Sequence, residues 1–231
     1  AALRAGAGMV SVATRPEHVA ALVSARPELM AHGVSSAADL APLLARATVL
    51  AVGPGLGRSA WGRELLAAAL ASGLPGVLDA DGLNLVAAAP QRLERWVLTP
   101  HPGEAGRLLG TDALGIEADR PAAVHALRAR YGSVVVLKGA GTLVAGAGPS
   151  LWLCDRGNPG MASAGMGDVL TGLVAGFMAQ LGDAERSACA GVLVHALAAD
   201  DAAAGGERGL VAGDVLAGLR AWVNSGGHQA R

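Results

Sequence analysis

Residues 133–138 read SVVVLK. A continuous run of Val and Leu is typical of a strand that is buried on both faces, as in a parallel sheet covered by helices. Short apolar runs on either side of it alternate with longer helical patterns. Strands that are separated by helices form βαβ units. The sequence therefore predicts an α/β fold with a central, mostly parallel sheet and helices on both of its faces.

The expected elements follow from the same patterns. Besides 133–138, strands are expected at residues 9–14, 48–52, 77–79 and 96–99, with a hairpin made by 142–145 and 151–153. Helices are expected at residues 16–24, 59–72, 83–88, 119–130, 169–180, 184–204 and 212–223, and in a segment that ends near residue 109. No linker and no internal repeat divides the chain, so we interpret residues 1–231 as one domain.

Composition excludes several classes of protein. The chain has 231 residues, of which 52% are hydrophobic, so a large core is expected and disorder is not. Only 16% of the residues are charged and the formal net charge is -1, which argues against a nucleic-acid partner. Cys154 and Cys189 suggest a reducing cytoplasm without disulfides, and no apolar run reaches the length of a membrane span. The chain begins at Ala1 in what reads as the end of a helix, so we expect it to be truncated at its N-terminus.

Four polar or glycine-rich segments follow expected strands. They are GPGLG at residues 53–57, DADGLN at 79–84, TPHPGE at 99–104 and KGAGT at 138–142. Ligands of open α/β sheets bind in the loops at the carboxyl ends of the strands. The four segments are therefore expected to lie together around a ligand.

The most informative segment is GNPGMASAGMGD at residues 157–168, which leads directly into an apolar helix. Small residues let a backbone approach a ligand closely, and the free N–H groups at the start of a helix attract phosphate. Asp168 could act as a base toward a nearby hydroxyl while the amides hold a transferring phosphoryl group. The alternative is an ordinary helix start in which Asp168 favours the helix dipole.

Other residues have both a functional and a structural interpretation. Lys138 is the only lysine, and its glycine-rich loop suggests a contact with nucleotide phosphate, although it is no Walker A motif and could be a plain turn. His101 lies between strand end and helix next to two prolines, which favours a ligand contact over a surface residue. Asp79 and Asp81 have two interpretations: they are paired carboxylates, or they belong to a turn at a strand end in which Asp79 fixes backbone amides. A metal site at His195, Asp200 and Asp201 is disfavoured, because no second His or Cys joins them. The four tryptophans, Trp61, Trp96, Trp152 and Trp222, are interpreted as core.

Together these stretches resemble the ADP-dependent NAD(P)H-hydrate dehydratases of the ribokinase-like superfamily. The matching runs are ALRAGAGMVSVATRPEH, SARPELM, VGPGLG, DADGLN, LTPHPGEAGRLLG, VVVLKGAGTLVA and NPGMASAGMGDVLTG, and they occur in the family's order. The resemblance implies a ribokinase-like fold whose first strand lies upstream of this chain. It departs from the family pattern at Ala164, where a glycine is usual, at residues 194–202 and at residues 212–214.

The resemblance implies a lyase that removes water from the S epimer of hydrated NADH or NADPH, with release of AMP and phosphate. ADP would be the co-substrate, with ATP as an alternative and Mg²⁺ beside its phosphates. Asp168 is implied as the catalytic residue. Substrate contacts are implied for Gly55, His101, Pro102, Gly103, Glu104, Arg107 and Asp168. Nucleotide contacts are implied for Lys138, Gly139, Ala140, Gly141, Thr142, Asn158, Gly165, Met166 and Gly167.

The resemblance also bears on partners and on rival functions. It implies a cytoplasmic homo-oligomer, with a tetramer as one form, and an epimerase that is either fused to the chain or a separate partner. The rival enzyme is a small-molecule kinase of the same superfamily, acting on hydroxyethylthiazole or hydroxymethylpyrimidine. A third hypothesis is a nucleotide-binding remnant without activity, against which the intact Asp168, Lys138 and His101 argue.

Overall fold

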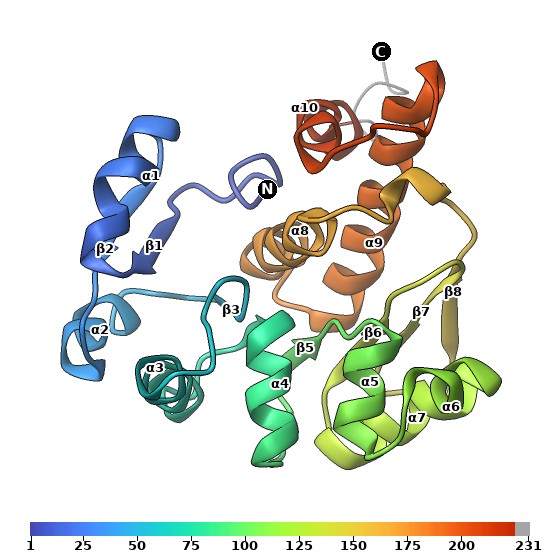
Figure 1. Ribbon diagram of the computed structural model, residues 1–231, viewed down its shortest axis with the longest axis horizontal. Coiled ribbons are helices and arrows are strands. Elements are labelled where there is room, and N and C mark those ends of the chain that lie inside the picture. Colours follow the sequence, from blue (N-terminus) through green and yellow to red (C-terminus); the bar gives the residue numbers. More distant parts are fainter. Residues whose placement is uncertain (225–231) are drawn as a thin grey trace.

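The main sheet of the computed structural model has six strands, in the order β3-β4-β5-β6-β7-β8 (Figure 1). The structure describes residues 1–224. The strands are β3 (Leu50–Val52), β4 (Gly76–Leu78), β5 (Trp96–Leu98), β6 (Val134–Leu137), β7 (Thr142–Ala145) and β8 (Leu151–Cys154). Strands β3 to β6 are parallel, and β7 and β8 are added as an antiparallel hairpin. The mostly parallel sheet and the hairpin confirm the predictions from the sequence.

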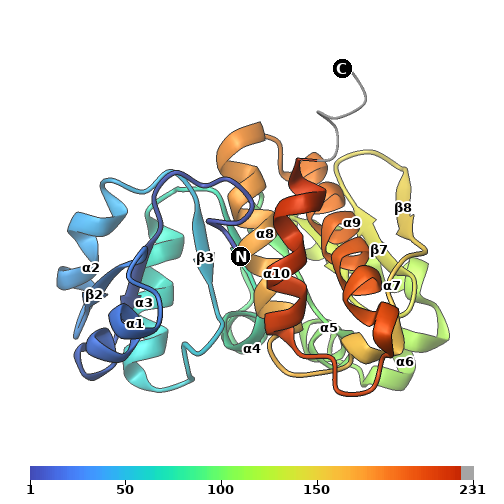
Figure 2. The same cartoon turned by 90° about the horizontal axis from the view of Figure 1, so that it is seen from above.

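A second, smaller sheet lies beside β3 rather than within the main sheet. It pairs β1 (Ser11–Thr14) with β2 (Met30–Gly33) in parallel, through a crossover made by η1 (Pro16–His18) and α1 (Val19–Ala25). The views in Figure 1 and Figure 2 both place this small sheet on the β3 side of the molecule. One central sheet was expected, whereas residues 1–224 form two. An upstream strand stays a prediction.

Helices cover both faces of the main sheet, because its strands are apolar on both. One face carries α3 (Ala60–Ala71), α4 (Ala80–Ala88), α5 (Pro102–Leu109), α6 (Ala113–Ala118) and α7 (Arg120–Tyr131). The other face carries α8 (Met166–Leu181) and α9 (Ala184–Ala202), with α10 (Ala212–Val223) packed against them (Figure 2). Successive strand residues alternate between the faces: Val77 and Val97 pack with α8 and α9, and Leu78 and Leu98 pack with α4 and α5.

The packing of α9, the longest helix, explains its high hydropathy. Within residues 1–224, the segment 184–205 is long and apolar enough to cross a membrane by length and composition alone. In the structure this segment is α9 with the short η3 (Ala203–Gly205), and it packs against α8, α10 and strands β5 to β8. Packing against these neighbouring elements therefore accounts for the apolar character of the segment.

Three elements were not predicted. They are β2, α6 and α2 (Ala37–Leu44), all short, and α2 carries Pro42 inside the helix. Several predicted strands are also shorter than expected, such as β1, which starts at Ser11 rather than at residue 9. The short η2 (Pro159–Met161) lies inside the loop that precedes α8.

The interpretation of the tryptophans was wrong for one of them. Trp96 is buried, but Trp152 is 56% exposed. Trp152 lies on the edge strand β8, where its indole N–H donates to Glu185 Oε1 at 3.1 Å. An edge strand has no further strand beyond it, so the apolar residues of its sequence do not all reach the core.

Candidate active site

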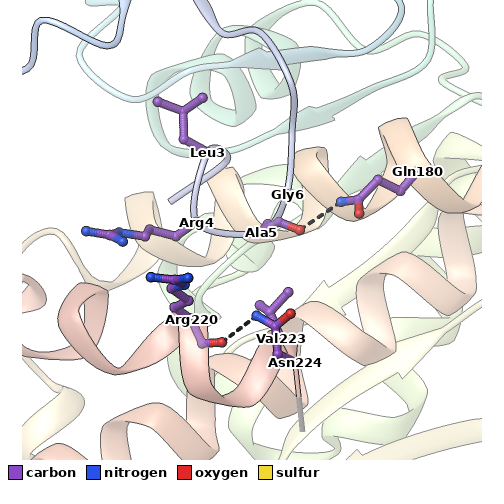
Figure 3. A pocket seen from close by; sticks show the side chains of 8 residues that line it. All are labelled: Leu3, Arg4, Ala5, Gly6, Gln180, Arg220, Val223 and Asn224. Carbon is purple, nitrogen blue, oxygen red and sulfur yellow. Dashed lines mark hydrogen bonds between the residues drawn. The ribbon is translucent and has the colours of Figure 1, made fainter. Parts of the chain in front are cut away.

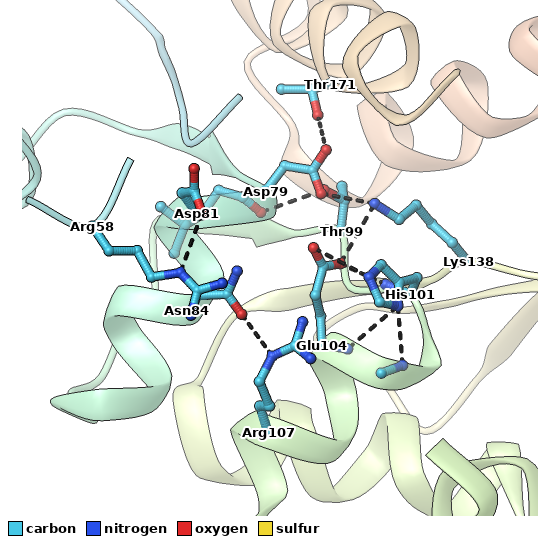
Figure 4. A network of polar contacts seen from close by, with 12 residues as sticks. Arg58, Asp79, Asp81, Asn84, Thr99, His101, Glu104, Arg107, Lys138 and Thr171 are labelled. Carbon is cyan, nitrogen blue, oxygen red and sulfur yellow. Dashed lines mark hydrogen bonds and ion pairs between the residues drawn. The ribbon is translucent and has the colours of Figure 1, made fainter. Parts of the chain in front are cut away.

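Side chains from three of the predicted segments, those of Asp79, His101 and Lys138, lie together after β4, β5 and β6, with Thr171 of α8 beside them (Figure 4). A Cβ on Gly53 would stand 1.8 Å from the carbonyl oxygen of Asp79, so the loop after β3 touches the end of β4. A Cβ on Gly167 would stand 3.3 Å from Lys138 Nζ and 3.4 Å from Asp79 Oδ2. The first turn of α8 therefore lies directly against the ends of β4 and β6.

Lys138 lies between two buried carboxylates. Its Nζ is 2.8 Å from Asp79 Oδ1 and 3.7 Å from Glu104 Oε2. The other oxygen of Asp79 accepts a hydrogen bond from Thr171 Oγ1 of α8 at 2.8 Å. Glu104 in turn accepts from the backbone N–H of His101 at 2.9 Å. These contacts fix the ammonium group at the meeting point of β4, β6, α5 and α8.

The loop before α8 is fastened to α9. The side-chain amide of Asn158 donates to Ala199 O and Asp200 Oδ1, and its oxygen accepts from Gly160 N–H at 3.1 Å. The N–H of Gly157 also donates to Asp200. The amide of Asn158 is thus occupied within the protein, and its geometry supports a role in shaping the loop. Ala164, the departure from the family pattern, is exposed.

Helix α8 begins at Met166, with Gly165 in the left-handed conformation at its N-cap. The side chain of Met166 is buried, so only its backbone is available to a ligand. Residues 166–168 contribute N–H groups that have no partner within a helix at its first turn. Phosphate binds favourably to such a turn, because the N–H groups and the helix dipole both attract an anion.

Asp168 occupies the third position of α8 and is exposed toward solvent. Within residues 1–224 its carboxylate makes no hydrogen bond to another side chain. Partial burial raises the pKa of Asp168 above its usual value, the charge of Asp79 raises it further, and the ammonium of Lys138 opposes the shift. A carboxylate with a raised pKa is a better base, which suits proton abstraction.

The loop of Lys138, Gly139, Ala140, Gly141 and Thr142 is closed by two side chains. Thr142 Oγ1 donates to Gly139 O at 3.0 Å. Arg120 of α7 donates to Leu137 O at 3.3 Å and to Gly141 O at 3.1 Å, so its guanidinium spans the two ends of the loop. Gly139 and Gly141 have φ values of 147° and 67°, which a glycine adopts without strain.

His101 caps α5 with its ring. Nδ1 accepts from the N–H of Gly103 at 3.0 Å and of Glu104 at 3.4 Å, so the proton of the neutral ring is on Nε2. Nε2 lies 3.5 Å from Glu104 Oε1. Burial lowers the pKa of His101, and the charge of Glu104 opposes that shift. Pro102 is the first residue of the helix, where its fixed φ is favourable.

Gly55 and Arg107 lie at the rim. Gly55 is in the turn after β3, where a Cβ would meet nothing within 4 Å. That turn is tied down by Asp81, whose Oδ2 accepts from Gly57 N–H at 3.0 Å. Arg107 is exposed and its Nε donates to Asn84 Oδ1 at 2.6 Å. Glu104 is different: its side chain is only 6% exposed and faces Lys138 and His101.

The sequence did not reveal three of the supporting residues. Asp79 was left open between a functional and a structural interpretation, and Thr171 and Arg120 were not considered. Thr171 follows Asp168 by three residues, so a helical projection places both on one side of α8. No local pattern marks Arg120, because its partners lie 17 and 21 residues further along the chain.

The residues that were weighed as a metal site have other partners. Asp200 anchors Gly157 and Asn158, and Asp201 accepts from the indole of Trp222 at 2.7 Å. His195 is buried, and within residues 1–224 its Nε2 has no hydrogen-bond partner. Burial lowers the pKa of His195 to about 4, and the charge of Lys138 adds to that effect.

A hollow elsewhere on the molecule is unrelated to these residues (Figure 3). It lies between the N-terminal turn, the end of α8 and the end of α10, and it is lined by Leu3, Arg4, Ala5, Gly6, Gln180, Arg220, Val223 and Asn224. It contains none of the predicted site residues. The chemistry is therefore expected at the strand ends, not in this hollow.

The mostly parallel sheet, with helices on both faces and a helix N-terminus at the strand ends, is an α/β fold of the ribokinase-like class, and a ribokinase-like superfamily protein from Enterococcus faecalis superposes with a TM-score of 0.86. Hydroxyethylthiazole kinase from Pyrococcus horikoshii has this fold, with a TM-score of 0.66 at 16% identity over 94% of this chain and 87% of that one. That similarity shows the fold alone.

A family model described as NAD(P)H-hydrate dehydratase matches residues 1–220. The chain belongs to the NAD(P)H-hydrate dehydratase family. An ADP-dependent (S)-NAD(P)H-hydrate dehydratase from Neisseria meningitidis is 39% identical over 213 residues, covering 89% of this chain and 71% of that protein. The ADP/ATP-dependent NAD(P)H-hydrate dehydratase of Bacillus subtilis, co-crystallised with ATP and Mg²⁺ and soaked with CoA, superposes with a TM-score of 0.84. It is 26% identical, and the match covers 97% of this chain and 83% of that one.

A longer relative is the bifunctional NAD(P)H-hydrate repair enzyme Nnr of Coxiella burnetii. It is 52% identical over 225 residues, which is 97% of this chain but 46% of that protein. The chain thus spans about half the length of such relatives.

Proposed function

We propose that this chain catalyses the ADP-dependent dehydration of the S epimer of hydrated NADH and NADPH. The observation that carries the proposal is the position of Asp168: its carboxylate lies in the first turn of α8, within electrostatic reach of Asp79 and Lys138. A base, a helix N-terminus and a fixed cation are thereby combined at one place. These are the groups that a phosphoryl transfer from ADP to a hydroxyl requires.

The reaction needs phosphorylation because hydroxide is a poor leaving group and phosphate is a good one. Asp168 removes the proton of the ring hydroxyl, whose oxygen attacks the β-phosphorus of ADP as the bond to the AMP oxygen breaks. The lone pair of the ring nitrogen then expels phosphate. Loss of a proton from the neighbouring ring carbon restores the double bond of NAD(P)H. The products are NAD(P)H, AMP and phosphate.

Lys138 and the loop before α8 serve the nucleotide in this proposal. The ammonium of Lys138 would meet the phosphates, and the amides of residues 165–168 would hold the charge that develops during transfer. Residues 139–142 and Asn158 shape the two loops around the nucleotide. The rim residues Gly55, His101, Pro102, Gly103 and Arg107 would contact the hydrated dinucleotide. Glu104, which faces inward, would support Lys138 and His101 from within the protein.

Mg²⁺ would accompany the nucleotide. Residues 1–224 contain no group of three or more His, Cys, Asp and Glu side chains arranged to hold a metal ion. Mg²⁺ commonly keeps several waters and binds through substrate phosphates. A site whose protein groups are a cation and backbone amides fits an ion that is held mainly by the phosphates. When bound, Mg²⁺ supplies neutralisation of phosphate charge.

The wider assignments remain part of the proposal. The name of the Coxiella relative, a bifunctional repair enzyme, supports a second activity on the same hydrates, for which we propose an epimerase in the same polypeptide or in a partner. We further propose that the chain acts in the cytoplasm as a homo-oligomer. Sedimentation of the full polypeptide would measure its assembly.

Product analysis tests the proposed function against the kinase alternative. Purified protein is incubated with hydrated NADH and ADP. Reduced nicotinamide is followed by its absorbance, and the amounts of AMP and phosphate are measured in the same samples. The proposal expects all three products in equal amounts. A stable phosphorylated product without recovery of reduced nicotinamide would favour a kinase, and binding of ADP without any turnover would favour a non-catalytic module.

A further inference from the structure

Asp79 has the most constrained surroundings of the site but no role in the reaction described above. Its side chain is only 2% exposed. It is the N-cap of α4, and the residue after it, Ala80, has a φ of 47°, a left-handed conformation that costs energy for any residue other than glycine. Strain of this kind persists where the surrounding structure holds it, and it is common at functional sites.

The two carboxylate oxygens of Asp79 have separate partners. Oδ1 lies 2.8 Å from Lys138 Nζ at the end of β6, and Oδ2 accepts from Thr171 at 2.8 Å in the second turn of α8. Asp79 therefore ties the strand end that carries the ammonium to the helix that carries Asp168. Glu104 is a weaker partner of Lys138, because it is 3.7 Å away.

We propose that Asp79 is a positioning residue: it holds the Lys138 ammonium against the first turn of α8 and places a negative charge near Asp168. This inference rests on the proposed function only in naming Asp168 as the base. Asp79 itself is covered by Lys138 and Thr171, so it acts through these residues and not by touching the substrate.

The charges around Asp168 determine the direction in which its pKa should move when Asp79 or Lys138 is removed. Asp79 from the end of β4 favours the protonated form of Asp168, and Lys138 from the end of β6 favours the ionised form. Glu104 and His101 of α5 and His195 of α9 also interact with Lys138. Removal of Asp79 should lower the pKa of Asp168, whereas removal of Lys138 should raise it. General loosening of the site would instead admit water and lower the pKa of Asp168 in both variants.

The test uses the variants Asp79→Asn and Lys138→Met in the protein without ligands. The pKa of Asp168 is followed by NMR of carboxyl groups labelled with ¹³C, and Asp168→Asn assigns the signal. We expect a lower pKa in Asp79→Asn and a higher one in Lys138→Met. Shifts in the same direction, or no shift in either variant, would overturn the proposal. If Asp79→Asn does not fold, Lys138→Met is measured alone. A pKa of Asp168 that does not rise in Lys138→Met then overturns the proposal.

Kinetics provides a second readout. In Asp79→Asn we expect kcat to fall by about 10- to 100-fold, because the ammonium is no longer held in place. The acidic limb of the kcat/KM profile should also move to lower pH. A fall in kcat with an unmoved limb would contradict the proposed charge effect. The NMR titration does not depend on turnover, so it tests Asp79 even if dehydration is not the reaction.

Discussion

Lys138 Nζ lies 3.3 Å from the place where a Cβ on Gly167 would stand. That contact is tighter than ordinary packing, whereas Asp79 Oδ2, 3.4 Å from the same place, stands at an ordinary contact distance. A side chain at residue 167 would therefore push against a cation that two carboxylates hold in position. The packing of the site, and not the backbone of α8, therefore disfavours a side chain at residue 167.

Gly167→Ala should weaken the use of ADP without unfolding the protein. We expect the KM for ADP to rise by about 10-fold, since the methyl group displaces Lys138, while thermal stability stays the same or increases because Ala favours helix. Gly218→Ala is the control: Gly218 lies in the interior of α10, and a Cβ there would meet only atoms of Ala198, at 3.7 Å or more. Equal kinetics in both variants would contradict the packing argument.

Asp168→Asn should increase the stability of the protein at neutral pH. A carboxyl whose pKa is raised in the folded state costs stability when it is ionised. That cost is absent below the usual pKa of Asp and appears as the pH rises through the raised value. Urea unfolding of parent and variant should thus give curves that separate above this range and coincide below it. A variant that is less stable at neutral pH would contradict the shift.

Arg120→Lys should loosen the loop at residues 138–142. Both hydrogen bonds come from Nη2 of Arg120, and a lysine ends one atom short of that nitrogen, so at least one hydrogen bond is lost. The KM for ADP is expected to rise several-fold, by roughly 10-fold at most, with a smaller change for the hydrate. Arg92→Lys, which replaces an exposed arginine, serves as the control. A larger effect on the KM for the hydrate would be evidence against this role of the loop.

His195→Leu should make the protein less sensitive to acid. Burial lowers the pKa of His195 to about 4, so the folded state disfavours its charged form. The parent is therefore expected to lose stability as the pH falls from about 6.5 to 4, by at most about 3.5 kcal/mol, because one pKa unit corresponds to about 1.4 kcal/mol. The variant lacks this loss. His125→Leu, an exposed position on α7, should behave as the parent does, and parallel curves for all three would refute the prediction.

The layers of the fold were predictable because they depend on local patterns. The run at residues 134–137 is apolar on both faces, and the structure places helices against both. The division into two sheets was not predictable in this way, because pairing between distant strands leaves no local pattern. The exposure of Trp152 was missed for the same reason: its strand is apolar, and only the sheet order makes it an edge.

The residues of the candidate site also differ in whether local sequence reveals them. Asp168, Lys138 and His101 stand in unusual glycine- and proline-rich contexts, and these three could be selected from the sequence. Arg120 and Thr171 stand in ordinary helical sequence, and their importance comes from partners that only folding supplies. Asn158 shows a further limit: its amide is fully engaged with α9, which sequence context does not reveal.

The most direct test of the account compares ADP binding and dehydration in Asp168→Asn with those in Asp39→Asn, which changes the same third helical position in α2, away from the candidate site. Calorimetry measures the affinity for ADP, and the absorbance of reduced nicotinamide measures turnover of hydrated NADH. We predict that Asp168→Asn binds ADP as the parent does and loses at least about 100-fold in kcat, whereas Asp39→Asn keeps both. Turnover by Asp168→Asn at the rate of the parent would contradict the central claim that this carboxylate is the base.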